Sequence, residues 1–384
     1  MVLKQQLPRV LRPPRQSFFL FGPRGTGKST WVKQSFPGAH RLDLLDEGLY
    51  QELAARPQAF ADRLRELRPR SWVCVDEVQR LPQLLNDVHR LIEDRSLRFV
   101  LSGSSARKLR RAGVNLLAGR ALTKHLYPLT PTELERAFSL ESALRVGTMP
   151  LVLASTQPEE TLRAYVQTYL REEIQAEAVV RNLPGFFRFL PVAATFHGQV
   201  INVSAVARDS GVTRTTVDDY LTILDDTLLT WRLPGFEAKL RVRERKHPKL
   251  YWLDAGIVRA AKKQLGPVAL EERGALFEGW VATLLRAWDQ YRGLFDDLSY
   301  WAPTEGPQAE VDFLLRRGHR FIAVEAKSSS RLRPDDLKGL LAIEPLKGLE
   351  RRILVYPDTA TLKTKEGIEV MGFDAFNKLI ERGL

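Results

Sequence analysis

Cysteine is nearly absent from this sequence, which contains only Cys74 among its 384 residues. A single cysteine cannot close an internal disulfide, and it cannot build a zinc site of several cysteines. The sequence also lacks apolar runs of the roughly 18 residues that a transmembrane helix needs. The N-terminal segment MVLKQQLPRVLRPPRQ is too rich in charge and proline for a secretory signal. These absences predict a cytoplasmic protein that does not insert into a membrane.

Repeats and low-complexity tracts are lacking as well, so we do not expect a solenoid. Hydrophobic residues make up 44% of the chain and charged residues 27%, a balance that excludes intrinsic disorder as the main state. The length of 384 residues favours two or three domains. Lys and Arg number 58 against 46 Asp and Glu, which gives a net charge of +12. This surplus favours polyanionic partners, nucleic acid above all, although the composition alone also fits an anionic membrane surface.

A glycine-rich motif follows the first apolar run of the chain. The run at 17–21 is typical of a buried strand, and GPRGTGKST at 22–30 fits the phosphate-loop pattern G-x-x-x-x-G-K-[ST]. In this pattern the backbone N–H groups face the phosphates, Lys28 reaches the β- and γ-oxygens of ATP, and Ser29 ligates Mg²⁺. The alternative is a flexible glycine turn. The residues expected to bind the nucleotide are Gly22, Pro23, Arg24, Gly25, Thr26, Gly27, Lys28, Ser29 and Thr30.

Two further strands are predicted to end at the same site. The apolar run at 72–75 leads into Asp76, expected beside Mg²⁺ and its water shell, and Glu77, expected to polarise the attacking water. A buried strand that ends in solvated acids is the alternative. The run at 99–105 ends in Ser102 and Ser104, whose hydroxyls either hydrogen-bond the γ-phosphate or form a turn. Because helical patterns alternate with these strands, we expect an α/β fold with a parallel sheet and its ligands at the carboxyl ends of the strands.

These motifs together resemble a known family of bacterial and archaeal AAA-type P-loop ATPases. The resemblance starts with the phosphate loop, the strand with its acidic pair, the GSS strand and LAGR at 117–120, and it continues in YLREEI, LDAGIVRA, GALFEGWVATLL and EVDFLL in the second half. It implies ATP binding and hydrolysis, a sensor-like role for Ser104, and an uncharacterised C-terminal domain without a known substrate. Arg120 is a candidate arginine finger for a neighbouring subunit of a homo-oligomer, or else an ordinary surface arginine.

The middle of the chain has the pattern of a winged helix. Residues 203–224 read as helix, turn and helix, with Gly211 at the turn and Thr213 as a cap for the second helix. The basic segment at 239–249 lies between two expected wing strands and predicts contacts with DNA phosphates. Asp218 and Asp219 on the expected recognition helix oppose such contacts. Docking of this region on the ATPase core therefore stays open as the alternative.

A hairpin with two facing carboxylates is predicted at 310–327. Gly318 and His319 suit a two-residue type II′ turn, which places Asp312 opposite Glu325 and Glu310 opposite Lys327. The other face of the hairpin is wholly apolar. Like charges directly opposite each other destabilise a sheet, so this pair needs a cation, a shared proton or full solvation.

The spacing of Asp312, Glu325 and Lys327 is similar to the PD-(D/E)XK signature of restriction-endonuclease-like folds, except that Val311 replaces its proline. In such sites the two acids hold Mg²⁺, and the lysine activates a water that attacks a phosphodiester. Glu278 on a preceding helix would be a third metal ligand. A surface hairpin with an ordinary Glu310–Lys327 ion pair is the alternative.

The sequence thus predicts three domains, namely a P-loop ATPase at 1–150, a helical and winged-helix region at 151–265, and a small α/β nuclease-like domain at 266–384. The expected function is an ATP-hydrolysing enzyme that acts on DNA, with a metal-dependent C-terminal nuclease. The alternative is an ATP-switched binding protein whose nuclease-like domain is inactive.

Overall fold

The computed structural model describes residues 7–105, 109, 117, 119–176, 182–237, 244–304, 309–329, 331–358 and 360–384. The chain divides into two compact units. The first unit comprises Met1–Leu129, Met149–Thr156 and Ile223–Leu229, and the second comprises Thr130–Thr148, Gln157–Thr222 and Thr230–Leu384. The division into three domains at 150 and 265 stays a prediction.

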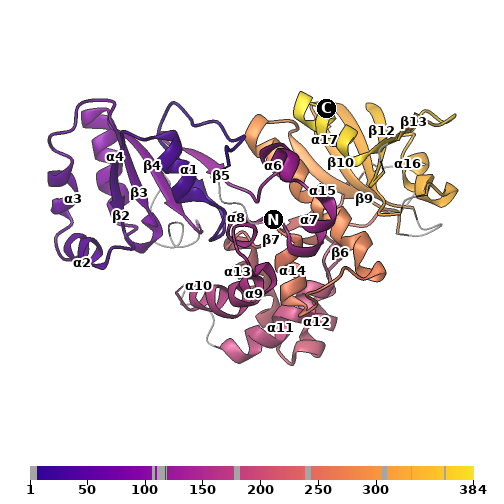
Figure 1. Cartoon of the computed structure of the whole chain (residues 1–384), viewed down its shortest axis with the longest axis horizontal. Helices are drawn as coiled ribbons and strands as arrows, with labels where there is room; N and C mark the ends of the chain where they lie inside the picture. Colours follow the sequence, from indigo (N-terminus) through magenta and orange to yellow (C-terminus); the bar gives the residue numbers. More distant parts are fainter. Residues whose placement is uncertain are drawn as a thin grey trace. The chain divides into compact units, whose positions relative to one another are not determined.

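The first unit is built on a five-stranded parallel sheet with the strand order β2-β3-β4-β1-β5 (Figure 1). The parallel α/β fold expected from the alternating pattern is therefore confirmed for this part of the chain. The strands are β1 (Phe18–Phe21), β2 (His40–Asp43), β3 (Trp72–Asp76), β4 (Arg98–Gly103) and β5 (Leu122–His125). The α-helices are α1 (Lys28–Ser35), α2 (Glu47–Ala55), α3 (Gln58–Arg63), α4 (Leu84–Arg95) and α8 (Pro150–Leu153), and a 3₁₀ turn spans Val78–Arg80.

The interior strand β1, which lies between β4 and β5, belongs to the core of the sheet. All four side chains of β1 are buried, as expected for a strand covered on both faces of a parallel sheet. Helix α4 buries Leu84, Leu85, Val88 and Leu91, which share one apolar face at helical spacing. The carboxyl ends of β1, β3 and β4 consequently lie at one edge, where the candidate site is found.

The second unit begins with helices and a small antiparallel sheet of order β6-β8-β7. Its strands are β6 (Gln199–Val200), β7 (Thr230–Leu233) and β8 (Lys249–Trp252). Gly211, with φ 63, ends α12, and the hydroxyl of Thr213 accepts a hydrogen bond from the N–H of Thr216 in α13. The helix-turn-helix is thus present at the expected residues. The α-helices of this part are α6 (Pro131–Leu134), α7 (Leu140–Val146), α9 (Pro158–Ala164), α10 (Leu170–Ala176), α11 (Leu183–Thr195), α12 (Val203–Ser210), α13 (Arg214–Asp226) and α14 (Ala255–Ala261), with a 3₁₀ turn at Glu135–Ala137 and a π turn at Tyr165–Tyr169.

A mixed six-stranded sheet of order β13-β14-β12-β11-β10-β9 completes the second unit. The predicted hairpin has the predicted register, with Phe313 opposite Val324 and Leu315 opposite Ile322. Gly318 has φ 60 and His319 does not have a positive φ, which fits a type II′ turn. The strands are β9 (Asp297–Trp301), β10 (Val311–Arg317), β11 (Arg320–Ala326), β12 (Leu349–Tyr356), β13 (Thr361–Lys363) and β14 (Glu369–Gly372). The helices are α15 (Leu270–Arg292), α16 (Lys338–Ala342) and α17 (Phe373–Arg382), with a 3₁₀ turn at Pro334–Leu337.

Helix α15 has 23 residues, but it carries charged side chains along its length. Across the part of the chain that the structure describes, no helix combines the length and the apolar character needed to cross a membrane.

Candidate functional site

The loop between β1 and α1 curls tightly enough to present its backbone to a ligand. Gly25 and Gly27 both have φ 86, a conformation that residues with a Cβ rarely adopt. A Cβ on Gly22 would lie 2.6 Å from the carbonyl oxygen of Leu126. The three glycines are therefore required by the shape of the loop, and α1 begins directly after it at Lys28.

Lys28 lies against the loop with its ammonium group bonded to backbone oxygens. Its Nζ donates to the carbonyl of Gly22 at 2.7 Å and to that of Pro23 at 3.3 Å. The residue is only 6% exposed. A cation at this place adds its charge to the dipoles of the loop amides and of the N-terminus of α1, which together favour an anion.

Ser29 and Asp76 meet although they are far apart in the sequence. The Ser29 hydroxyl, in the first turn of α1, donates to Asp76 Oδ2 at 2.6 Å. The hydroxyl of Ser102, at the end of β4, donates to the other carboxylate oxygen of Asp76. Hydroxyl and carboxylate oxygens are the ligands that Mg²⁺ prefers, so this donor set fits the expected metal. Ser102 itself contacts Asp76, a partner that its strand-end position did not predict.

Glu77 is held by Gln79, a residue to which the sequence assigns no role. Glu77 has φ 55, and its carboxylate accepts a hydrogen bond from Gln79 Nε2. The same nitrogen contacts the hydroxyl of Ser104 at 3.1 Å. Gln79 thus joins the acidic pair to the GSS strand end. The two side chains meet only because a 3₁₀ turn follows Glu77. The sequence alone does not show this turn, so it does not indicate that Gln79 contacts Glu77.

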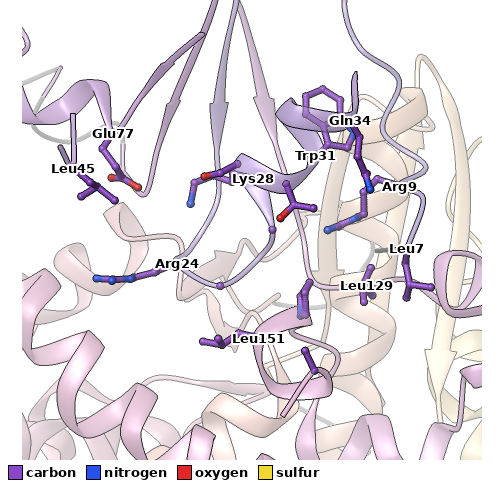
Figure 2. A pocket seen from close by; sticks show the side chains of 16 residues that line it. Leu7, Arg9, Arg24, Lys28, Trp31, Gln34, Leu45, Glu77, Leu129 and Leu151 are labelled. Carbon is purple, nitrogen blue, oxygen red and sulfur yellow. The ribbon is translucent and has the colours of Figure 1, made fainter. Parts of the chain in front are cut away.

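A cavity of about 480 Å³ opens beside this loop (Figure 2). In Figure 2, Leu45 and Glu77 lie on one side of Lys28, and Arg9, Trp31 and Gln34 lie on the other. Arg9 fastens the segment before β1 to the loop, since its guanidinium donates to the carbonyl of Thr26 at 2.8 Å and to that of Tyr127. Further lining residues are Leu7, Arg24, Gly25, Gly27, Ser29, Thr30, Leu129, Pro150, Leu151 and Ala154.

Arg120, the candidate arginine finger, forms an ion pair with Glu93 of the same chain. The side chain of Arg120 is 41% exposed and that of Glu93 50% exposed, and exposed pairs of this kind contribute little to stability. A role for Arg120 in a neighbouring subunit stays a prediction.

A second group of charged residues gathers around the hairpin of the second unit. Asp312 and Glu325 are buried, at 3% and 4% exposure. The backbone N–H of Asp312 donates to Glu325 Oε2 at 3.2 Å, and the N–H of Ala326 donates to Asp312 Oδ2 at 2.9 Å. Lys327 pairs with Glu325. The predicted residues of the hairpin therefore do converge, and Glu278 of α15 lies beside them.

Lys249 corrects two of the expectations from the sequence. It was expected in a basic wing that contacts DNA phosphates, but its side chain is 3% exposed and its Nζ lies 2.9 Å from Glu278 Oε1 and 3.4 Å from Asp312 Oδ1. It also pairs with Glu310, while Lys327 pairs with Glu325, so the described residues show other ion pairs than the Glu310–Lys327 pair of the alternative reading. The rest of the wing is only partly visible, because Lys239, Arg241 and Arg243 lie outside the described residues.

Burial dominates the acid–base properties of this cluster. It raises the pKa of Glu278 to about 7, with the Asp312 charge acting in the same direction, and it raises the pKa of Glu325 well above its usual range. Burial alone would lower the pKa of Lys249, but Glu278, Asp312 and Glu310 raise it well above its ordinary value. These carboxylates therefore favour the charged form of Lys249.

The carboxylates of the second unit do not fit a divalent metal in this conformation. Glu278, Glu310 and Asp312 each offer an oxygen within 4.8 Å of the others, an arrangement that would suit a hard cation. These three carboxylates are also the three that hold the ammonium of Lys249. The lysine and a metal would need the same place.

Three family models match consecutive parts of the chain. Residues 14–135 match the AAA domain, residues 137–267 match a domain of unknown function (DUF8612), and residues 273–376 match another (DUF4143). The first match includes the glycine loop and the Asp76–Glu77 pair, so this part of the chain is an AAA-type P-loop domain. The endonuclease-like assignment of the last part has no counterpart in these matches.

Similar proteins extend over most of the chain. The uncharacterised protein Rv2008c of Mycobacterium tuberculosis is 28% identical over 347 residues, which cover 88% of this chain and 76% of the relative. An uncharacterised protein of Haemophilus influenzae is 21% identical over 380 residues, 91% of each chain. These relatives carry no assigned activity.

Among solved structures, the Walker-type ATPase PABY2304 of Pyrococcus abyssi is similar with a TM-score of 0.43 and 15% identity, over 64% of this chain and 90% of that one. The Aeropyrum pernix ORC1 protein in complex with DNA has a TM-score of 0.26 and 13% identity, over 65% and 86%.

Proposed function

We propose that the AAA-type domain binds ATP with Mg²⁺ and hydrolyses it. The observation that carries this proposal is the hydrogen bond of 2.6 Å between Ser29 and Asp76. It brings the metal ligand of the glycine loop to the acidic end of a neighbouring strand, beside a buried lysine and a curled loop. An arrangement of this kind binds a triphosphate through backbone amides, one ammonium group and a metal.

Each residue of the loop has a separate task in this proposal. The amides of residues 22–27 and Lys28 bind the phosphates, while Ser29 and Asp76 would hold Mg²⁺, which neutralises charge on the phosphate oxygens when it is bound. Glu77 orients the attacking water, and Gln79 and Ser104 fix the position of Glu77. The apolar side chains of Leu7, Leu129 and Leu151 line the same cavity, where they would pack against the adenine base of ATP.

Two substitutions test this function. Lys28→Ala should lose nucleotide binding, because the phosphates lose their ammonium contact. Glu77→Gln should keep ATP bound while turnover stops, because an amide cannot accept the proton of water. Fluorescent-nucleotide titration and phosphate release measure the two effects. Tight MgATP binding by the Lys28 variant, or full turnover by the Glu77 variant, would refute the assignment.

We further propose that the second unit binds DNA by contacting the phosphates of the DNA backbone. The element order α11-β6-α12-α13-β7-β8 supports a winged helix, and the net charge of +12 favours a polyanion. Arg214 is exposed on α13 but is accompanied by the exposed Asp218 and Asp219. Binding is therefore expected to depend on phosphate contacts, including those of the exposed Arg245 and Lys246, and to show little sequence preference.

A metal-dependent endonuclease is a second candidate function, favoured by the convergence of Asp312, Glu325 and Lys327 with Glu278. It would require the ammonium of Lys249 to leave the carboxylates first. If this function is real, DNA should be nicked in the presence of Mn²⁺, and Lys327→Ala should abolish nicking without changing ATP turnover. Absence of cleavage on every DNA form, with and without ATP, would leave an ATP-switched binding protein with an inactive nuclease-like domain.

A further inference from the structure

The ammonium group of Lys249 lies where three carboxylates converge. Its Nζ contacts one oxygen each of Glu278, Glu310 and Asp312, and these oxygens lie within 4.8 Å of one another. The ring centre of Tyr300 is 5.4 Å from the same nitrogen, so an aromatic face adds to the cation's surroundings. A single point inside the second unit thus has the surroundings of a bound cation.

Lys249 is presented from a strand that is paired on both sides. In the small sheet β8 lies between β6 and β7, with Lys249 opposite Val200 on one side and opposite Leu233 on the other. The backbone of Lys249 is therefore fixed by its neighbours, and the side chain enters the cluster from a rigid element. The hydroxyl of Tyr251, two residues further along β8, donates to Glu278 Oε1 and fixes that carboxylate as well.

The charges of the cluster explain why a cation is needed at this point. Glu278, Glu310, Asp312 and Glu325 bring four carboxyl groups together, and the ammonium of Lys327 contacts only Glu325 among them. Buried carboxylates of like charge repel each other unless a cation or protons compensate them. Lys249 supplies that compensation for the three carboxylates that Lys327 does not contact.

We infer that Lys249 is the resident cation of this carboxylate site and that its ammonium excludes a divalent metal as long as β8 is in place. The inference rests on the proposed nuclease-like site only for the identity of its carboxylates. We call such a site self-closed, because a side chain of the same chain occupies the place of the metal. The cation comes from β8, which lies in the residues that match DUF8612, and the carboxylates come from the residues that match DUF4143. A metal can enter only when the side chain of Lys249 has left.

Metal binding by the full chain tests the inference directly. Mn²⁺ binding to the nucleotide-free protein is followed by electron paramagnetic resonance, with Asp76→Asn in every variant to remove the metal ligand of the ATPase site. The parent should bind no Mn²⁺ at the carboxylate site. Lys249→Met, which keeps the side chain as far as Cε but removes the ammonium group, should gain a Mn²⁺ site that Asp312→Asn abolishes again. Lys249→Arg keeps the cation and should resemble the parent.

Thermal unfolding keeps the test decisive if Lys249→Met folds poorly. Without metal this variant should unfold at a lower temperature than the parent, because its carboxylates lose their counter-charge. Mn²⁺ should raise its unfolding temperature back to that of the parent. A purely structural ion cluster would be destabilised in the same way but not rescued by Mn²⁺, and that result would overturn the inference. A Mn²⁺-dependent stabilisation of the parent that Asp312→Asn removes would overturn it equally.

The nuclease proposal fails independently of this inference. If Lys249→Met binds Mn²⁺ but does not nick DNA, the site is self-closed but not catalytic. If the parent nicks DNA through Asp312 with Lys249 in place, Lys249 does not exclude the metal.

Discussion

At the scale of single residues, His197 is a buried histidine whose ring stays uncharged. Its Nδ1 accepts a hydrogen bond from the backbone N–H of Trp252 at 3.1 Å, and its Nε2 has no partner among the described residues. A Cβ on Gly279 would lie 2.0 Å from this Nε2, so the ring is enclosed by α15. Burial, with a smaller effect of the Lys262 charge, lowers the pKa of His197 to about 3.

This shift predicts a stability that falls with acid. The unfolded chain binds a proton at His197 below about pH 6.5, whereas the folded chain does not until about pH 3. The free energy of unfolding should therefore decrease as the pH is lowered below 6.5, by about 2 kcal/mol at pH 5 from this residue. His197→Asn keeps an acceptor near Nδ1 and cannot titrate, so its denaturant-unfolding profile should lack this component. Parallel pH profiles for the two proteins would contradict the assignment.

The candidate ATP site was predictable from single residues because its motif is local. Gly22 to Ser29 are contiguous, and Asp76 was recognised because four apolar residues precede it. Lys249 was assigned wrongly for the opposite reason. Its neighbours in the sequence are basic, but its partners are Glu278 of α15, Glu310 just before β10, and Asp312 of β10. No local sequence pattern connects these three residues to Lys249. Gln79 was missed because an uncharged amide gives no signal until its turn is known.

At the scale of elements, the start of α14 is fastened to the end of α7. The Asp254 carboxylate caps α14 through the N–H groups of Gly256 and Ile257, and it also accepts a hydrogen bond from the N–H of Thr148 at 2.7 Å. The backbone of Gly256 comes so close to α7 that a Cβ there would lie 2.2 Å from the carbonyl oxygen of Val146. The LDAGIVRA segment is thus explained by packing.

A pair of matched substitutions tests this contact. Gly256→Ala should destabilise the second unit by about 1–3 kcal/mol or more, because a backbone oxygen must move. Gly274→Ala lies within helix α15 and meets only the Ser328 hydroxyl at 3.9 Å, so it should stabilise the chain by about 0.5–1 kcal/mol through helix propensity. Chemical denaturation measures both. Equal changes in the free energy of unfolding for the two substitutions would show that the close contact between Gly256 and Val146 does not determine stability.

The hairpin at the candidate nuclease-like site shows what the sequence determines at this scale. Its register follows from one turn glycine and from the alternation of apolar residues, and both are local. The order of the six strands also depends on β12, which pairs in parallel with β11 and with β14, and no tight turn can close a parallel pair. Such order is set by tertiary packing, and the sequence predicts only that the domain is α/β.

At the scale of the whole molecule, the net charge of +12 predicts how DNA binding responds to salt. Phosphate contacts release counterions, so the logarithm of the association constant should fall linearly with the logarithm of salt concentration, with a slope of about −0.9 for each contact. Arg245 and Lys246 are exposed, although Lys246 also pairs with Glu237 at 3.0 Å. Replacing both by alanine should therefore make the slope less steep by up to about 2.

Lys249→Arg is the matched control for this measurement, because its side chain is buried among carboxylates and reaches no phosphate. Fluorescence anisotropy on duplexes of unrelated sequence, repeated at several salt concentrations, gives the slopes. The control should bind DNA as the parent does, and the double variant should be weakened equally on every sequence. DNA binding that does not depend on salt, or a loss of affinity confined to one sequence, would exclude binding mainly through phosphates. Recognition of base edges would then be expected, and Arg214 on α13 would be the residue to substitute next.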